Sequence, residues 1–244
     1  MIYTHRKAEK LNEKLHPFEQ RYDILLDKGK NYILRLDGVN MTKNFLGKKD
    51  VRSLFLKTMR QTMQLLFNQE PKLKFAYSYS DEISILLEES VLNDYDYRLE
   101  KIVSIYTSKI TAAFYLAASK NQLPLYDRLR SFDGRIIGLD ERQLKDYFVS
   151  RQAFAISSHL IRLKNQHLPD LPSTNSKKII ATLKEKGIIY EEIPKEERYG
   201  LLWVNDGFQM PYEFKAFEGR FYFQLNQRQN YHRKQRKGKL QCSK

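Results

Sequence analysis

The sequence contains a single cysteine, Cys242, near its C-terminal end. One cysteine can form neither an intrachain disulfide framework nor a cysteine-based zinc site, so any metal must be bound by oxygen atoms or histidines. Long hydrophobic runs are also missing, and the N-terminus is charged, which argues against a membrane span and a signal peptide. We therefore expect a soluble, cytoplasmic protein with no membrane partner.

Positively charged residues outnumber negatively charged ones. Lys and Arg number 43 against 29 Asp and Glu, giving a formal net charge of +14. Such a surplus suits a polyanionic partner, because basic side chains that neutralise phosphates release counterions. Seven of the basic residues lie in residues 226–244, which contain no acid. This segment is expected to be disordered, and it could be either an RNA-binding arm or a solubilising tail.

Apolar residues make up 41% of the chain, enough for a real core. Their spacing predicts strands and helices in the order strand, helix, strand, strand, helix, strand. The expected ranges are 31–37, 51–67, 73–79, 83–88, 98–119 and 134–139. This is the ferredoxin-like split βαβ pattern, so the predicted fold class is α+β, with an antiparallel sheet and helices on one face.

Four segments are expected along the chain. They are an N-terminal helical segment at 1–23, a core at 24–140, a helical and hairpin C-terminal extension at 141–225, and the basic tail at 226–244. In the first segment, Leu11, Leu15 and Phe18 are spaced as one face of a short helix. In the third, helices are predicted at about 142–163 and 174–187, and a final hairpin at 211–225.

Acidic residues stand where two of the predicted strands meet. Asp37 ends the first strand at an Asp-Gly step, and Asp81 and Glu82 lie in the predicted hairpin turn. In the split βαβ arrangement the first and third strands are adjacent and antiparallel, so these acids would meet at one edge of the sheet. Clustered carboxylates repel one another unless a cation binds, and Mg²⁺ prefers such oxygen ligands. Ordinary turn chemistry uses the same residues, so the pattern alone leaves a two-metal site and plain turns both open.

Short motifs in this order resemble the tRNA-His guanylyltransferase family, over roughly residues 15–205. They are Arg35-Leu36-Asp37-Gly38, the run 76–84 with Ser80-Asp81-Glu82, Phe132-Asp133-Gly134-Arg135, and the helical pieces 144–148 and 151–153. The resemblance implies a polymerase palm-type fold and a metal-dependent nucleotidyltransferase that adds nucleotides to the 5′ end of tRNA or a related RNA, in the 3′–5′ direction. Such enzymes activate a 5′-monophosphate with ATP or GTP, and the 3′-hydroxyl of an incoming nucleotide then attacks it. The implied partners are GTP, ATP or other NTPs and tRNA or another RNA, and the implied assembly is a homodimer or homotetramer.

The resemblance also implies roles for individual residues. Asp37 and Asp81 would bind two Mg²⁺ ions, which Mn²⁺ could replace, with the carbonyl of Gly38 completing the ligands. Glu82 would support them as the third catalytic residue. The implied nucleotide-binding residues are Gly38, Val39, Asn40, Ser80, Arg98, Lys101 and Arg135. Arg98 and Lys101 are three positions apart, which places both on one face of the predicted helix.

The sequence departs from the family after Arg151-Gln152, where the family has Asp-Cys-His-Ile-Asn-Asn. Ile156 replaces the family histidine, and Ser158 and His159 replace the two asparagines. We expect His159 to be a packed or surface residue, with replacement of the missing imidazole as the alternative. Because these losses spare the acids, the chemistry is expected to persist and the acceptor RNA to differ.

Two other functions fit the same residues. A palm-type nucleotide cyclase would use the same paired acids and would form a cyclic product without RNA. A non-catalytic RNA-binding relative would keep the fold but bind no metal. The retained acids argue against the second alternative, since clustered carboxylates repel one another without a cation. The basic surplus favours RNA over the cyclase.

Overall fold

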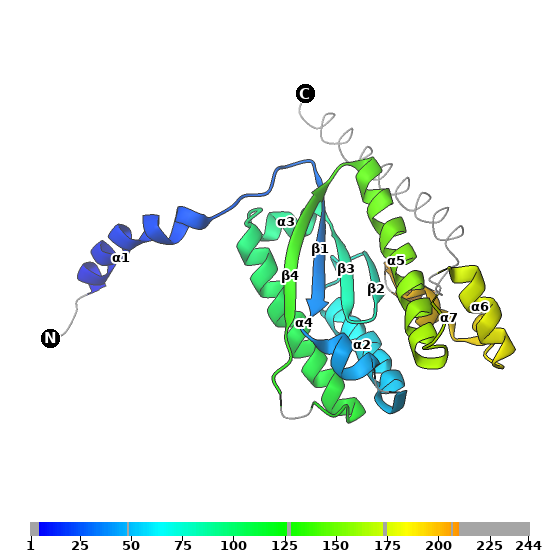
Figure 1. Ribbon diagram of the computed structural model, residues 1–244. Coiled ribbons are helices and arrows are strands. Elements are labelled where there is room, and N and C mark those ends of the chain that lie inside the picture. Colours follow the sequence, from blue (N-terminus) through cyan, green and yellow to red (C-terminus); the bar gives the residue numbers. More distant parts are fainter. Residues whose placement is uncertain (1–4, 48, 126–127, 173–174, 206, 210–244) are drawn as a thin grey trace.

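The computed structural model describes residues 5–209 except 48, 126–127, 173–174 and 206. At its centre is a six-stranded antiparallel sheet with the strand order β4-β1-β3-β2-β5-β6. Figure 1 shows this sheet between two layers of helices. The predicted hairpin at 211–225 and the basic tail lie outside the described residues.

The first four strands and two long helices form the predicted ferredoxin-like unit. In chain order the elements are β1 (Asn31–Gly38), η2 (Thr42–Leu46), α2 (Lys49–Gln69), β2 (Phe75–Tyr79), β3 (Glu82–Leu87), α3 (Glu89–Asp94), α4 (Leu99–Asn121) and β4 (Phe132–Leu139). Each predicted strand and helix of this unit is present, and the order β4-β1-β3-β2 confirms the predicted topology.

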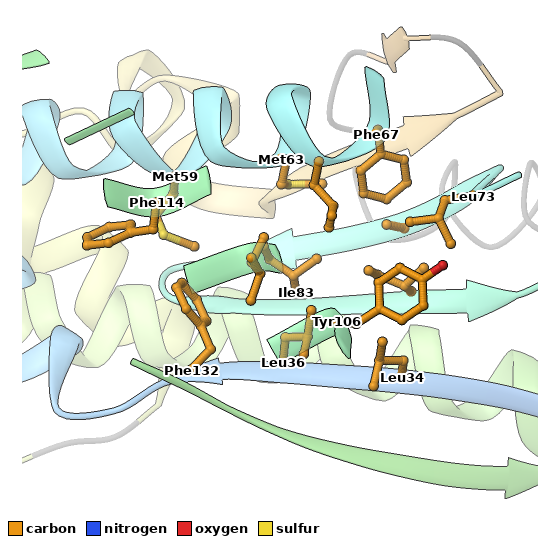
Figure 2. Packing of buried hydrophobic residues seen from close by; sticks show 14 of the residues in the cluster. Leu34, Leu36, Met59, Met63, Phe67, Leu73, Ile83, Tyr106, Phe114 and Phe132 are labelled. Atoms are coloured by element: carbon orange, nitrogen blue, oxygen red, sulfur yellow. The ribbon is translucent and has the colours of Figure 1, made fainter. Parts of the chain in front are cut away.

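One face of this unit packs against α2 and α4. Because successive side chains of a strand point to opposite faces, alternate residues such as Leu34, Leu36 and Ile83 point to this side, and all three are fully buried. Figure 2 shows them opposite side chains from the two helices, among them Met59, Met63, Tyr106 and Phe114. The resulting core extends along the whole length of the strands.

The opposite face carries α5 (Glu141–His167), which begins with a capping box between Asp140 and Gln143. A second apolar cluster joins this helix to the sheet, and its members include Ile33, Phe75, Leu86, Leu144 and Phe148. The α+β, ferredoxin-like fold class is therefore confirmed. The two helices of the repeat lie on one face, as predicted, and the first helix of the C-terminal extension covers the other.

The C-terminal extension also adds strands to the sheet. After α5 come α6 (Ser176–Glu185), η3 (Tyr190–Glu192), α7 (Lys195–Tyr199), β5 (Leu201–Val204) and β6 (Gly207–Gln209). The helices predicted at about 142–163 and 174–187 correspond to α5 and α6. The strands β5 and β6 were not predicted, although β5 pairs directly with β2. The division into four segments stays a prediction.

The N-terminal segment forms α1 (His5–Glu19) and the short η1 (Gln20–Tyr22), which extend away from the sheet in Figure 1. None of their residues is buried, and Leu11, Leu15 and Phe18 are exposed. Among the described helices, none has both the length and the hydrophobicity that crossing a membrane requires.

Candidate active site

The strand pairing brings three carboxylates into one row. Asp37, at the end of β1, lies directly opposite Glu82 of β3 on one side and Asp133 of β4 on the other. Directly opposed residues of antiparallel strands share a face, with Cβ atoms about 5 Å apart. The expected meeting of the first strand with the hairpin is therefore present, and the row lies on the face that carries α5.

Asp81 is joined to the same edge through the backbone. The Gly38 amide donates to the Asp81 carbonyl at 3.0 Å. A Cβ on Gly38 would lie 2.9 Å from the Asp81 Cβ and 2.7 Å from the sulfur of Met41. Only glycine allows this close approach, so Gly38 sets the separation between the two acidic segments.

The Asp81 carboxylate is buried and held by neutral donors. It accepts hydrogen bonds from the Thr42 amide at 2.8 Å, from Thr42 Oγ1 at 2.7 Å and from Ser80 Oγ at 2.8 Å. Ser80 has a left-handed backbone, with φ 61°. Such a conformation is costly for a residue other than glycine and is typical of functional turns. The turn thus aims Asp81 at the sheet edge, and Thr42 was not foreseen as its support.

Burial and neighbouring acids dominate the electrostatic environment of the Asp37 carboxyl. Burial, followed by the charges of the neighbouring Asp81, Glu82 and Asp133, raises the pKa of its carboxyl to about 6, although Arg35 acts in the opposite direction. Burial and like charges both disfavour the ionised form, and a bound cation would reverse both effects.

Glu82 differs from the other acids because it is paired. Arg151 of α5 binds both of its oxygens, with Nε 2.8 Å from Oε1 and Nη2 in contact with Oε2. The Arg35 Nε is 3.9 Å from Oε2. Ser84 Oγ lies 3.4 Å from Glu82 Oε1 and 2.8 Å from the hydroxyl of Tyr147, also on α5. The structure therefore gives Glu82 a structural partner that the sequence did not indicate.

A row of basic residues lies one step further along the same face. Arg35 and Arg135 are directly opposite each other on β1 and β4. Like charges in this position repel, so the pair is suited to an anion. Arg135 also contacts Asp133, Nη2 to Oδ1 at 3.3 Å. Asp133 was not predicted as a site residue. A signal was present, because Asp133 begins an Asp-Gly step like that of Asp37, and the predicted topology places its strand beside β1.

The residues at this edge fit Mg²⁺ through oxygen atoms. Asp37 and Asp81 supply carboxylates, and the Gly38 carbonyl belongs to the same segment. Within the described part of the chain, no three His, Cys, Asp or Glu side chains are placed to share one ion. Mg²⁺ is usually bound by one or two protein carboxylates, and water and substrate phosphate oxygens fill the rest of its coordination shell.

The remaining predicted nucleotide-binding residues divide into two groups. Val39 and Asn40 continue directly from Gly38 and are exposed next to the acids. Arg98 and Lys101 are not brought to this edge, because β3 runs away from Glu82 before α3 and α4 follow (Figure 1). The Arg98 Nη2 instead lies 3.0 Å from Asp23 Oδ1.

A cavity of about 260 Å³ adjoins the hairpin turn. Ser78, Tyr79 and Ser80 line one side, and α2 and the segment around α7 line the other, with Arg60 and Glu196 among the lining residues. These two charged residues are paired. The cavity reaches the candidate metal site only through Ser80, the residue before Asp81, because Asp37, Gly38 and Asp81 do not line it.

His159 is packed rather than placed at the carboxylates. It is fully buried, and neither ring nitrogen has a hydrogen-bond partner among the described residues. Burial and the nearby Arg162, Arg52 and Arg198 lower the pKa of its imidazole to about 3, so it is neutral at physiological pH. Its ring lies 5.9 Å from that of Tyr190. The expectation of a packed histidine agrees with this position.

Comparison with known proteins decides the family. The family model described as tRNAHis guanylyltransferase matches residues 12–140, more than half of the chain. The chain belongs to the tRNAHis guanylyltransferase family. This match includes the acidic edge described above.

Two curated relatives match the chain, and one of them is a named tRNA(His) guanylyltransferase. A tRNA(His) guanylyltransferase of Debaryomyces hansenii is 31% identical over 163 residues, which cover 63% of this chain and 58% of that protein. An uncharacterized protein of Acanthamoeba polyphaga mimivirus is 21% identical over 226 residues, covering 80% of this chain and 76% of the relative.

Solved structures share the fold. A bacterial tRNA(His) guanylyltransferase-like protein in complex with ATP superposes with a TM-score of 0.74 at 23% identity, covering 86% of this chain and 96% of that one. The Saccharomyces cerevisiae tRNA(His) guanylyltransferase gives a TM-score of 0.66 at 20% identity, covering 80% and 95%. A structure of bacterial tRNA(His) guanylyltransferase-like protein in complex with GTP gives a TM-score of 0.64 at 24% identity, covering 80% and 84%.

Proposed function

We propose that this member of the family is a metal-dependent nucleotidyltransferase that adds nucleotides to the 5′ end of tRNA or a related RNA, in the 3′–5′ direction. The observation that carries the proposal is the meeting of Asp37 and Asp81 at one sheet edge, joined by the hydrogen bond from Gly38 to Asp81. Family membership and the net charge of +14 support an RNA acceptor.

Asp37, Asp81 and the Gly38 carbonyl would hold two Mg²⁺ ions, or Mn²⁺ in their place. When bound, such ions activate an attacking oxygen and stabilise the leaving oxygen of an in-line displacement. The chain itself positions these ligands. Thr42 and Ser80 orient the Asp81 carboxylate, and burial among other acids makes the ionised form of Asp37 unfavourable unless a cation binds.

ATP and GTP are proposed as nucleotide substrates. Solved structures of bacterial tRNA(His) guanylyltransferase-like protein contain ATP or GTP. The opposed Arg35 and Arg135 provide cations for phosphate oxygens one step from the acids. Ser80 lies between Asp81 and the adjoining cavity, where it could contact a bound nucleotide. A homodimer or homotetramer is the proposed assembly.

The test presents the purified protein with tRNA that lacks one 5′ nucleotide, in 5′-monophosphorylated and 5′-triphosphorylated forms, with each labelled NTP and Mg²⁺. We expect the label to appear at the 5′ end of the tRNA. Transfer to the monophosphorylated form should require ATP or GTP for activation. Transfer to either form should stop when EDTA removes the metal. Label at the 3′ end, or metal-independent transfer, would contradict the proposal.

A reaction with NTPs and metal but no RNA separates the alternatives. A cyclic product formed without RNA would identify a nucleotide cyclase. RNA binding that neither metal nor NTP alters, without transfer, would identify a non-catalytic relative.

A further inference from the structure

Glu82 lies next to the candidate metal ligands but is turned toward α5. It is adjacent to Asp81 in the chain and directly opposite Asp37 across the sheet, and its charge raises the pKa of Asp37. Its carboxylate is nevertheless occupied by Arg151 through two parallel contacts. Bidentate pairs between a guanidinium and a carboxylate are strong and fix the orientation of both groups.

Arg151 is itself held in place. Its guanidinium carbon lies 5.1 Å from the centre of the Phe154 ring, one turn further along α5. The Arg151 and Glu82 side chains are only 23% and 15% exposed, so the pair is partly shielded from water. Tyr147, one turn earlier on α5, contacts Ser84 Oγ at 2.8 Å. Two successive turns of α5 are therefore attached by polar contacts to the strand that follows Asp81.

This arrangement explains an unexpected property of the site. Asp37, Asp81, Glu82 and Asp133 lie in one patch, yet no three of them are placed to share an ion. Mg²⁺ sites that act on phosphates usually contain one or two carboxylates, because the remaining positions are taken by water and by the substrate. A third protein carboxylate would bind the ion more tightly and would occupy a position that a phosphate oxygen needs.

We propose that Arg151 is a positioning residue that keeps Glu82 out of the metal coordination shell and thereby leaves a position for substrate phosphate. This inference rests on the proposed function, because it assigns Arg151 a task in the same metal site. Arg35, whose Nε is 3.9 Å from Glu82, is too distant to form the two short bonds that Arg151 makes.

The test compares Arg151→Gln with Arg142→Gln. Arg142 is exposed near the start of the same helix, so its substitution removes an identical charge without affecting Glu82. For each protein, Mn²⁺ affinity is measured by electron paramagnetic resonance, and nucleotide transfer is measured with 5′-monophosphorylated tRNA. In Arg151→Gln we expect Mn²⁺ to bind about 10-fold more tightly while transfer falls about 10-fold, the scale of an outer-shell partner. Arg142→Gln should change neither quantity.

A double variant assigns the effect to Glu82. In Glu82→Gln/Arg151→Gln the released carboxylate is absent, so Mn²⁺ affinity should return to the wild-type value. Arg151→Lys keeps the charge but cannot form both contacts, so it should show the same two opposed changes at smaller size. If Arg151→Gln does not fold, the lysine variant decides the question.

The outcomes distinguish the role of Arg151 from the proposed function of the protein. Opposed changes in Mn²⁺ affinity and transfer support the positioning role. Parallel losses of both, or no change in either, would overturn it. A wild-type protein that neither binds Mn²⁺ nor transfers nucleotides would instead overturn the proposed function itself.

Discussion

The two faces of the sheet differ in how far their apolar character extends along the strands. On the face that packs against α2 and α4, β1 places Leu34 and Leu36 in the core, so this face stays apolar almost to the end of the strand. On the face that carries α5, the side chains of the same strand change from apolar Ile33 through basic Arg35 to acidic Asp37.

Neighbouring strands repeat this change in register. Toward the same end of the sheet, the side chains on this face change from Leu86 through Ser84 to Glu82 in β3, and from Ile137 through Arg135 to Asp133 in β4. The face against α2 and α4 is therefore apolar along the strands, while the other face is apolar only in part and carries at its end charges that cost stability. Substitutions on the two faces should accordingly affect different measurements.

The largest effect on stability is expected from the apolar face. Phe114→Ala removes a fully buried ring that contacts Phe132 at 5.8 Å and Phe55 at 6.4 Å between ring centres. The free energy of unfolding should fall by about 3–5 kcal/mol in chemical denaturation. Leu116→Ala, on the same helix but 61% exposed, is the control and should change it by less than about 0.5 kcal/mol. Equal effects of the two would contradict the assigned core.

The largest effect on activity is expected from the charged end. Asp37→Asn should reduce nucleotide transfer by more than about 100-fold. Loss of a residue that only hydrogen-bonds to a metal ligand already reduces activity by about 10- to 100-fold, and Asp37 is itself a proposed ligand. Its unfolding free energy should not fall, because the change removes a charge that is partly buried among other acids. Asp146→Asn, an exposed site on α5, serves as the control for both measurements. Normal transfer by Asp37→Asn would remove Asp37 from the active site.

A smaller effect is expected where a neutral side chain supports an acid. Thr42→Val deletes the hydroxyl that contacts both oxygens of Asp81 but keeps the backbone amide. Transfer should fall about 10-fold, and the unfolding free energy should fall by about 1 kcal/mol. Thr42→Ser keeps the hydroxyl and should retain most of the activity. A serine variant as impaired as the valine variant would show that the methyl group, and not the hydroxyl, matters.

The smallest effect concerns pH and tests the electrostatics alone. The pKa of Asp37 is about 6 in the fold against 3.8 for an unperturbed aspartate. Between these values the folded protein binds more protons at this site than the unfolded chain, so the contribution of Asp37 to stability falls as pH rises through that range.

Chemical denaturation of metal-free protein across this range measures the difference. The wild type should lose stability relative to Asp37→Asn as pH rises from about 4 to about 6, and Mg²⁺ added above that range should stabilise the wild type more. Parallel pH profiles for the two proteins would contradict the raised pKa.

Much of this contrast could be predicted from the sequence. The alternation in 31–37 and 83–88 identified the strands, and the split βαβ order was enough to bring Asp37 beside Asp81 and Glu82. The same reasoning could have found Asp133, because β4 must lie next to β1 in this topology. It could also have excluded Arg98 from the acidic edge, since the strand that begins at Glu82 must lead away from it.

The contacts of α5 could not be predicted in this way. Its buried positions include Gln152 and His159 among apolar residues, which interrupts the pattern that marks a core-facing helix. The pairing of Arg151 with Glu82 spans 69 residues and depends on how α5 lies across the sheet. Local spacing contains no information about such a crossing.

The bond between the Gly38 amide and the Asp81 carbonyl has a mechanical consequence. It locks the tip of one strand to the bend of the neighbouring hairpin, so a displacement of either tends to carry the other with it. Both acids would then follow a shifting substrate as a unit with constant spacing. A side chain at position 38 would push these two pieces apart and separate the pair without altering either carboxylate.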